Sequence, residues 1–126
     1  MEVLSSRVLL QPTDFEKSFR FYSETLGLHV YREWGSEANR GVVFFLGGGF
    51  LELSGPSRTR SGGNVSLWLQ VRDVDAVGRG LEDAGVEVLG QATDKPWGLR
   101  EMAIRDPDGM RLVIIEVPEN HPLRRR

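Results

Sequence analysis

The sequence repeats one order of predicted secondary structure, and this repeat restricts the fold more than any other feature. In each half, a strand is followed by an amphipathic helix and then by three more strands. The first half has predicted strands at 7–11, 28–34, 42–46 and 50–54, with a helix at 14–26. The second half has predicted strands at 65–71, 86–89, 99–105 and 110–117, with a helix at 74–84. The sequence therefore predicts an α+β chain of two tandem βαβββ modules.

Both predicted helices carry start and stop signals. Thr13 and Glu16 form a capping-box pattern, and Gly27 can take the left-handed conformation that ends a helix. In the second half, Asp73 is the expected cap and Gly85 the expected end. Apolar stripes at helical spacing follow each start: Phe15, Phe19, Tyr22 and Leu26, and then Val74, Val77, Leu81 and Ala84.

Alternation within the strands separates two faces of one curved mixed sheet. In the strand at 50–54, Glu52 points away from the two leucines that flank it, and Val113 does the same in the last strand. We expect the leucine face to lie under the helices and the opposite, more polar face to line a groove. The final hairpin turns at 106–109, where Asp-Pro-Asp-Gly suits a type I turn.

The length of 126 residues is enough for one domain. We predict module one at about 3–56, a linker at about 57–63, module two at about 64–118 and a basic tail at 119–126. A net charge of -2, with its one dense basic run in this tail, argues against a nucleic-acid partner. No apolar stretch approaches a membrane span and the first residues do not read as a signal peptide, so we expect a cytoplasmic protein without a membrane partner.

Two segments and the repeated order of elements together resemble a known superfamily. Residues 14–28 read DFEKSFRFYSETLGL, the turn at 106–109 reads DPDG, and the repeated βαβββ order surrounds them. This combination resembles the vicinal-oxygen-chelate superfamily of glyoxalases, bleomycin-resistance proteins and dioxygenases, over nearly the whole chain. The run PWGLRE at 96–101 is most similar to the bleomycin-resistance branch. The resemblance implies paired modules around a groove, and a homodimer in which the groove can contain strands from both chains.

The resemblance also identifies the positions of four metal ligands in the metal-using members. They fall on Arg7, Glu52, Ser66 and Val113. Only Glu52 keeps a ligand of the expected type, because arginine is a permanent cation and valine has no lone pair to donate. Glu116 is the alternative to Val113 if the register of the last strand differs. Since the chain has no cysteine, only His, Asp and Glu remain as ligands, and we predict no metal, no other cofactor and no catalytic residue.

Aromatic and charged residues define the predicted ligand site. Arg7 and Glu52 are expected either to form a structural ion pair or to contact a ligand. Trp68 is expected to line the groove or, if the faces are reversed, to belong to the core. The predicted ligand-binding residues are Arg7, Glu52, Ser66, Trp68, Val113, Trp34, Trp97 and Glu101. The acids and aromatic planes suit a planar or cationic molecule, whereas Arg7 suits an acid, and the sequence leaves both open.

Two functions remain at this point. The first is a metal-free small-molecule-binding protein that sequesters an antibiotic or another aromatic metabolite. The second is a lyase, isomerase or dioxygenase-like enzyme of the same superfamily with a non-standard site. The ligand positions at Arg7, Ser66 and Val113 favour binding over catalysis.

Overall fold

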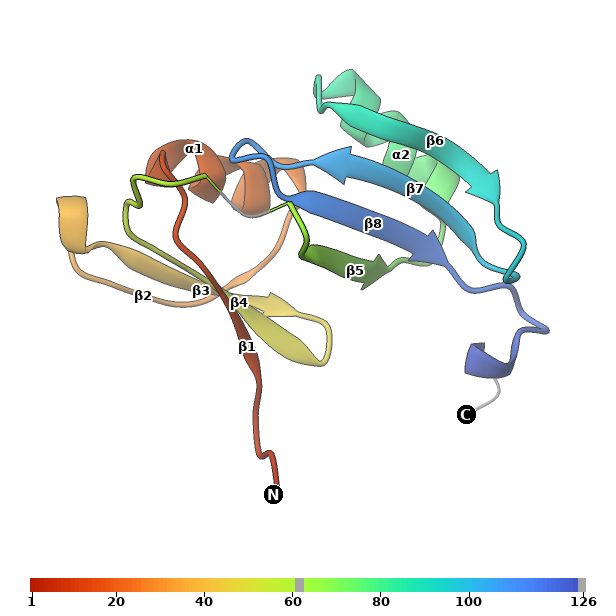
Figure 1. Cartoon of the computed structure of the whole chain (residues 1–126), viewed down its shortest axis with the longest axis horizontal. Helices are drawn as coiled ribbons and strands as arrows, with labels where there is room; N and C mark the ends of the chain where they lie inside the picture. The colour runs from red at the N-terminus through yellow and green to blue at the C-terminus, as the bar shows by residue number, and fades with distance from the viewer. Residues whose placement is uncertain (61–62, 125–126) are drawn as a thin grey trace. The chain divides into compact units, whose positions relative to one another are not determined.

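The computed structural model describes residues 1–60 and 63–124, which separate into two compact units, Met1–Ser61 and Gly62–Arg126 (Figure 1). Each unit contains one main helix and one four-stranded mixed sheet, so the α+β class and the tandem βαβββ modules are confirmed. The strands form two four-stranded mixed sheets, one in each unit, where the sequence analysis described one curved sheet. Parts of the predicted linker, at 61–62, and of the basic tail, at 125–126, lie outside the described residues.

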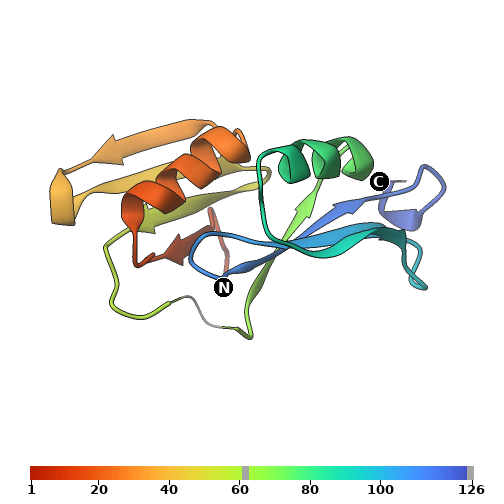
Figure 2. The ribbon, with the colours of Figure 1, turned by 90° about the horizontal axis from the view of Figure 1, so that it is seen from above.

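The first unit consists of seven elements in the predicted order. They are β1 (Arg7–Leu10), α1 (Phe15–Arg20), the π-helical turn η1 (Phe21–Thr25), β2 (Val30–Trp34), the short 3-10 turn η2 (Glu37–Asn39), β3 (Gly41–Leu46) and β4 (Gly49–Ser54). The strand order is β1-β4-β3-β2, with β1 parallel to β4 and the other pairs antiparallel. Phe44 of β3 contacts the rings of Phe19 and Tyr22, which places the helical segment over one face of this sheet (Figure 2).

The first helix differs from its prediction at both ends. Its N-cap is Asp14 rather than Thr13, because the Asp14 carboxylate accepts a hydrogen bond from the Lys17 amide at 3.1 Å. After Arg20 the helix widens into η1, where the Leu26 amide donates to the Phe21 carbonyl. Phe21 and Tyr22 are both buried there, and the predicted apolar stripe had omitted Phe21.

The second unit repeats the order of the first. It contains β5 (Ser66–Gln70), α2 (Val74–Asp83), β6 (Val88–Asp94), β7 (Arg100–Arg105), β8 (Arg111–Glu116) and the 3-10 turn η3 (Pro122–Arg124). The strand order is β5-β8-β7-β6, with β5 parallel to β8, as β1 is to β4. Figure 2 shows α2 over one face of this sheet.

The buried stripe of α2 is Val74, Gly78 and Leu81, at the spacing of one helix face. Ala84, which we predicted to be buried, is exposed. Gly78 is buried instead, because the side chain of Met102 on β7 lies against it and leaves little room for a Cβ. The predicted cap Asp73 is confirmed, since its carboxylate accepts from the Ala76 amide at 3.0 Å.

Strand β6 begins two residues later than predicted and extends to Asp94. The start moves because the Val86 amide donates to the Leu81 carbonyl and so belongs to the end of α2. The extension carries no apolar alternation, and its pairing with β7 holds it in the sheet.

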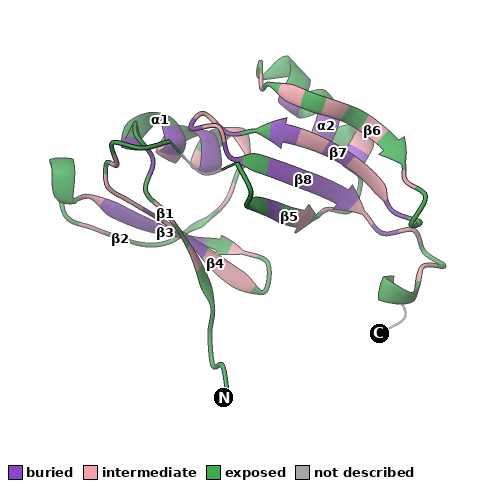
Figure 3. Ribbon diagram, viewed as in Figure 1, coloured by how far each residue is buried: buried purple, intermediate pink, exposed green. Residues whose placement is uncertain are grey.

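Most of the buried apolar residues lie on strands of the two sheets, and β8 is buried along most of its length (Figure 3). The predicted turn before β8 is confirmed. The Gly109 amide donates to the Asp106 carbonyl at 3.1 Å, and the buried Asp106 carboxylate accepts from the Asp108 and Met110 amides at 2.9 and 2.8 Å. These bonds fix the register between β7 and β8.

Candidate functional site

Each sheet has one face under its helix and one face that its helix does not cover, which we call the helix-free face. In the first unit, the register pairs Arg7 with Phe50 and Leu9 with Glu52 across β1 and β4. Side chains that alternate with the helix-facing Leu51 therefore belong to the helix-free face. The predicted orientation of Glu52 is confirmed, and Arg7 shares its face.

In the second unit, the register pairs Ser66 with Arg111 and Trp68 with Val113 across β5 and β8. These pairs occupy the same places in their sheet as the two pairs of β1 and β4 do in the first. The predicted equivalence of Arg7 with Ser66, and of Glu52 with Val113, follows directly from the strand pairing. The four positions that the resemblance identified thus lie on the two helix-free faces, two on each.

Arg7 and Glu52 form an ion pair in the first unit. The Arg7 Nη1 atom donates to Glu52 Oε1 at 2.9 Å. The Glu52 side chain is 18% exposed and that of Arg7 is 36% exposed, so the guanidinium has more contact with solvent than the carboxylate. The one carboxylate that remains of the family's ligand set is therefore already neutralised by a cation.

The residues at the four ligand positions do not fit a metal ion. A guanidinium beside the site repels a cation and has no lone pair to donate. Val113 has no donor atom, and the Ser66 hydroxyl accepts a hydrogen bond from Arg111 Nη1 at 3.3 Å. Glu52 alone offers a carboxylate, and a single ligand does not make a four-coordinate site.

Three aromatic rings on the helix-free face of the first unit form a cluster that the sequence analysis missed. Tyr31, Phe45 and Phe50 contact one another, with ring centroids 5.0, 5.1 and 5.7 Å apart. Tyr31 is 51% exposed and Phe45 is 46% exposed, while Phe50 is half-buried. The Arg7 guanidinium lies 5.8 Å from the centre of the Phe50 ring. This aromatic cluster therefore adjoins the Arg7–Glu52 pair.

A signal for part of the aromatic cluster exists in the sequence. Phe50 has the same strand parity as Glu52, so alternation alone places it on the helix-free face. Phe45 joins it only through the antiparallel register of β3 with β4. Tyr31 lies where the pairing of β2 with β3 shifts register, so simple alternation does not predict its direction.

Trp34 also lies on the helix-free face of the first unit. It pairs with Gly41, and its ring lies so close to that glycine that an added Cβ would overlap the indole. The Arg32 guanidinium lies 5.7 Å from the centre of the indole ring. Trp34 is half-buried, so part of this side chain is in contact with solvent.

The predicted aromatic residues of the second unit are exposed. Trp68 is 52% exposed on the helix-free face, which excludes the alternative that it belongs to the core of this unit. Trp97 is 60% exposed in the loop before β7, and its indole Nε1 donates to Glu101 Oε2 at 2.5 Å. The structure therefore brings the predicted residues Trp97 and Glu101 together.

Val113 is buried, although it lies on the helix-free face. Its side chain is 8% exposed and belongs to an apolar cluster with Leu99, Ile115 and Val117. The alternative residue, Glu116, lies on the other side of the sheet, where its Oε1 atom accepts from the Val74 amide at 3.0 Å. Val113 and not Glu116 therefore occupies the position equivalent to Glu52.

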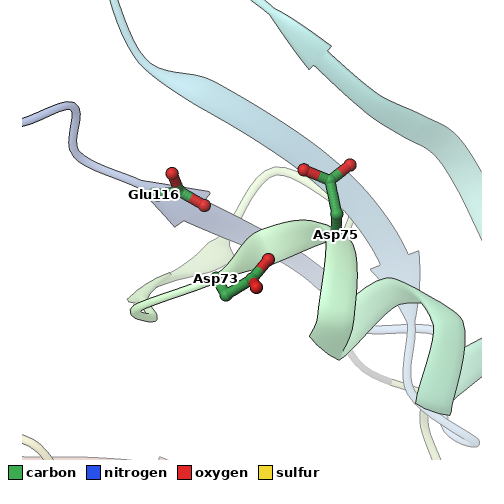
Figure 4. Close-up of side chains that lie close together, drawn as sticks. All are labelled: Asp73, Asp75 and Glu116. Carbon is green, nitrogen blue, oxygen red and sulfur yellow. The ribbon is translucent and has the colours of Figure 1, made fainter.

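An acidic cluster at the start of α2 also has the residue types of a metal site. In the described part of the chain, Asp73, Asp75 and Glu116 place one carboxylate oxygen each within 4.8 Å of one another, from the start of α2 and the end of β8 (Figure 4). Each carboxylate has a structural partner. Asp73 and Glu116 accept from amides of the first helical turn, and Asp75 binds Arg100 through two bonds of 2.9 Å. We assign no metal site there.

The Arg100 guanidinium lowers the pKa of the Asp75 carboxyl, mainly through these hydrogen bonds. The same bonds, together with a third to Asp94 at 3.1 Å, raise the pKa of Arg100. Asp75 therefore stays ionised as the counter-ion of Arg100. This network lies on the side of the sheet that α2 covers, because Arg100 pairs with Glu116 in the register.

Within residues 1–60 and 63–124, no helix is both long and apolar enough to cross a membrane.

Comparison with known proteins agrees with this arrangement. Residues 5–114 match the family model described as Glyoxalase/Bleomycin resistance protein/Dioxygenase superfamily. No protein with a curated function matches the sequence.

Several solved structures share the fold. A superfamily member from Sphaerobacter thermophilus is 25% identical, with a TM-score of 0.77 over 91% of this chain and 98% of that chain. TnmS3, an antibiotic binding protein from Streptomyces sp. CB03234, is also 25% identical, with a TM-score of 0.73 over 93% and 98% of the two chains. TioX from Micromonospora sp. ML1 is 22% identical, with a TM-score of 0.71 over 90% and 95%, and shares the fold. The chain belongs to the glyoxalase/bleomycin resistance protein/dioxygenase superfamily, as its sequence motifs had predicted.

Proposed function

We propose that this protein binds a small organic molecule with a planar aromatic group, and that it does so without a metal ion or another cofactor. One observation carries the proposal. The position of the first family ligand holds Arg7, which pairs with Glu52 at 2.9 Å and adjoins the exposed aromatic cluster of Tyr31, Phe45 and Phe50. A face with this composition is suited to stack a planar molecule and is poorly suited to bind a cation such as Zn²⁺.

The exposed rings supply the driving force for binding. Tyr31 and Phe45 leave about half of their side-chain surface in water. Full burial of a large apolar side chain is worth about 1.5–3 kcal/mol, so covering these half-exposed rings contributes a useful part of that amount. Trp68 and Trp97 offer two further exposed indole rings in the second unit. Each unit therefore offers its own proposed stacking surface, with Tyr31 and Phe45 in the first unit and Trp68 and Trp97 in the second.

An antibiotic is the ligand class we propose first. TnmS3, which is 25% identical over most of both chains, is an antibiotic binding protein. A binding protein of this kind protects a cell by sequestration and needs no catalytic residue. We accordingly assign none: the Ser66 hydroxyl accepts from Arg111, and both histidines lie outside the ligand positions.

The binding test uses intrinsic fluorescence and calorimetry with planar natural-product antibiotics. We expect saturable binding that changes tryptophan emission, because an aromatic ligand stacks near Trp68. Trp68→Ala should weaken binding ~10- to 100-fold, which corresponds to about 1–3 kcal/mol. Its unfolding free energy should fall by less than the about 3–5 kcal/mol typical of a core tryptophan, because half of this side chain is in solvent.

A matched control separates stacking from general loss of apolar surface. Leu4 is an exposed apolar residue before β1, and Leu4→Ala should leave the affinity unchanged. A double variant, Tyr31→Ala with Phe45→Ala, tests the aromatic cluster in the same way and should weaken binding ~10-fold or more. If no planar compound binds, or if both stacking variants bind as the wild type does, the proposal is wrong.

We further propose that the protein is cytoplasmic and forms a homodimer. The strands β1 and β2 are the edges of the first sheet, and β5 and β6 are those of the second. Edge strands with free backbone groups are common sites of self-association. Sedimentation velocity should show a dimer that dissociates on dilution, and a monomer at all concentrations would contradict this part of the proposal. The cysteine-free chain needs no oxidising compartment to fold.

A further inference from the structure

We infer that the helix-free face of the first unit selects aromatic molecules that carry an anionic group. This inference rests on the proposed function and adds to it the charge of the ligand. The sequence left that charge open, because Glu52 suits a cation and Arg7 suits an acid. The contacts of the two residues, and a third charged residue on the same face, decide between these alternatives.

The register places three charged side chains on this face. Glu52 pairs with Val43, and Val43 pairs in turn with Arg32 of β2. Arg7, two positions from the partner of Glu52 on β1, has the same parity. Among the strand residues that the register assigns to this face, the formal charge is therefore two cations against one anion.

The single anion on this face, Glu52, already has a cationic partner. Glu52 is 18% exposed and accepts from Arg7 Nη1 at 2.9 Å. A cationic ligand would have to replace or share this partner and would approach a guanidinium while doing so. Arg7 is in a different position, because a guanidinium has five N–H donors and Glu52 occupies one of them. At 36% exposed, Arg7 can donate its other N–H groups to a second acceptor.

Arg32 has more capacity to bind an anion than Arg7. It is exposed, and within the two described ranges no carboxylate lies within ion-pair distance of it. The neighbouring acid, Glu33, pairs with Val42 and so projects to the helix side, where it lies 3.8 Å from Arg40. The contact that the structure shows for Arg32 is the indole ring of Trp34, which holds the guanidinium against the face.

An aromatic acid meets each of these groups with a complementary one. Its ring stacks on Tyr31, Phe45 or Phe50, and its carboxylate or phenolate oxygen accepts N–H groups from Arg7 or Arg32. Arginine is well suited to this role because its planar fork matches a carboxylate in two parallel hydrogen bonds. An aromatic cation of the same shape gains the stacking and meets net positive charge.

The test uses three pyrene derivatives that share the ring system and carry an anionic, a neutral or a cationic substituent at the same position: 1-pyrenecarboxylate, 1-pyrenecarboxamide and 1-pyrenemethylammonium. Affinities are measured by fluorescence titration of the full chain at low salt, where exposed charges are least screened. We expect the carboxylate to bind about 10-fold more tightly than the amide and the ammonium to bind most weakly. Raising the salt should reduce this preference and leave the affinity of the amide nearly unchanged.

Three variants identify the residues responsible. Arg32→Gln should reduce the preference for the carboxylate about 3- to 10-fold without changing the affinity of the amide. Glu52→Gln removes the negative charge that neutralises Arg7 and repels an anion, so the carboxylate should bind more tightly than it does to the wild type. Arg20→Gln removes the same charge from the exposed end of α1, on the helix side of the same unit, and should change neither affinity.

The outcomes separate this inference from the proposed function. If all three derivatives bind with equal affinity, or if the ammonium binds most tightly, the inference on charge is overturned while aromatic binding stands. If none of the three binds, and planar antibiotics do not bind either, the proposed function falls together with the inference. An increase in carboxylate affinity in Glu52→Gln is an effect that a purely structural ion pair would not produce.

Discussion

The two helix-free faces share one backbone plan and carry different chemistry. In the first unit, the position of the last-strand ligand holds Glu52, which is half-buried and paired with Arg7. In the second unit, the equivalent position holds Val113, which is buried in a cluster with Leu99 and Ile115. The comparison shows that strand register alone does not fix the chemistry of a position, because the same position holds a paired carboxylate in one unit and a buried valine in the other.

The arginines on the two faces show the same contrast. In the first unit, Arg7 on the first strand is paired with a carboxylate of the last strand. In the second unit, the arginine is on the last strand, and Arg111 donates to the hydroxyl of Ser66 on the first. A hydrogen bond from a guanidinium to a neutral hydroxyl is weaker than one to a carboxylate, because in the second case both groups are charged. The first unit therefore has the stronger charged pair, and the second unit has exposed indole rings and a buried apolar cluster of its own.

The largest loss of stability is expected from a cavity in the buried cluster of Leu99, Val113, Ile115 and Val117 in the second unit. Ile115 is fully buried, so Ile115→Ala should lower the unfolding free energy by about 2–5 kcal/mol. Phe45→Ala, on the helix-free face of the first unit, should cost about 1–2 kcal/mol because that ring is 46% exposed. Urea unfolding of both variants measures the difference. Equal losses would mean that the two faces do not differ in packing as we describe.

The strand parity and the start of α2 could be predicted from the sequence because they are local. Alternation in β4 placed Glu52 opposite its flanking leucines, and the register confirms this placement. The type I turn before β8 was readable from four residues. The position of Asp73 as a cap was readable in the same way. Each of these features depends on residues within one turn or one strand.

The aromatic cluster could not be predicted because it depends on pairing between strands. Phe45 and Phe50 meet through the β3–β4 register, and Tyr31 joins them at a register shift in β2. The extension of β6 to Asp94 could not be predicted for the same reason. Its sequence lacks apolar alternation, and the pairing with β7 keeps it in the sheet. The burial of Val113 likewise involves Leu99, which precedes β7 and so comes from another strand connection of the second unit.

A smaller change in stability, which depends on pH, is expected from the ion pair of Asp75 with Arg100 in the second unit. Asp75 in the second unit binds Arg100 on the helix side, and its pKa is lowered from the ordinary value of 3.8. A carboxyl with a lowered pKa stabilises the fold fully above its unfolded pKa, and this contribution is lost as the pH falls through the folded pKa. Asp75→Asn should therefore lower the Tm at pH 7 and have less effect below about pH 3.8.

The control for this pH dependence is Asp94→Asn. Asp94 makes one bond to the same arginine and its side chain is 85% exposed, so its loss should lower the Tm less than the loss of Asp75 does. Thermal unfolding between pH 2.5 and pH 7 measures both variants. A Tm difference between Asp75→Asn and the wild type that grows as the pH falls would contradict the assigned direction of the pKa.

The smallest change in stability is expected from added metal ions. This prediction tests whether Glu52, which keeps the carboxylate that Val113 lacks, can hold an ion. A site that binds an ion with useful affinity stabilises the fold in proportion to the logarithm of ion concentration. With one carboxylate, already paired with Arg7, the first unit should show no such stabilisation. We expect Zn²⁺ or Ni²⁺ at about 100 µM to shift the Tm by less than about 1 °C.

Elemental analysis of the purified protein completes the metal test, and we expect less than about 0.1 divalent ion per chain. The protein should also leave a methylglyoxal–glutathione adduct unchanged, because that chemistry needs the Lewis acid that the ligand set does not hold. One ion per chain that disappears in Glu52→Gln would place a metal on the helix-free face and overturn the metal-free proposal. The matched control is Glu116→Gln, since an ion lost in that variant alone would belong to the acidic cluster of Asp73, Asp75 and Glu116 and leave the helix-free face without one.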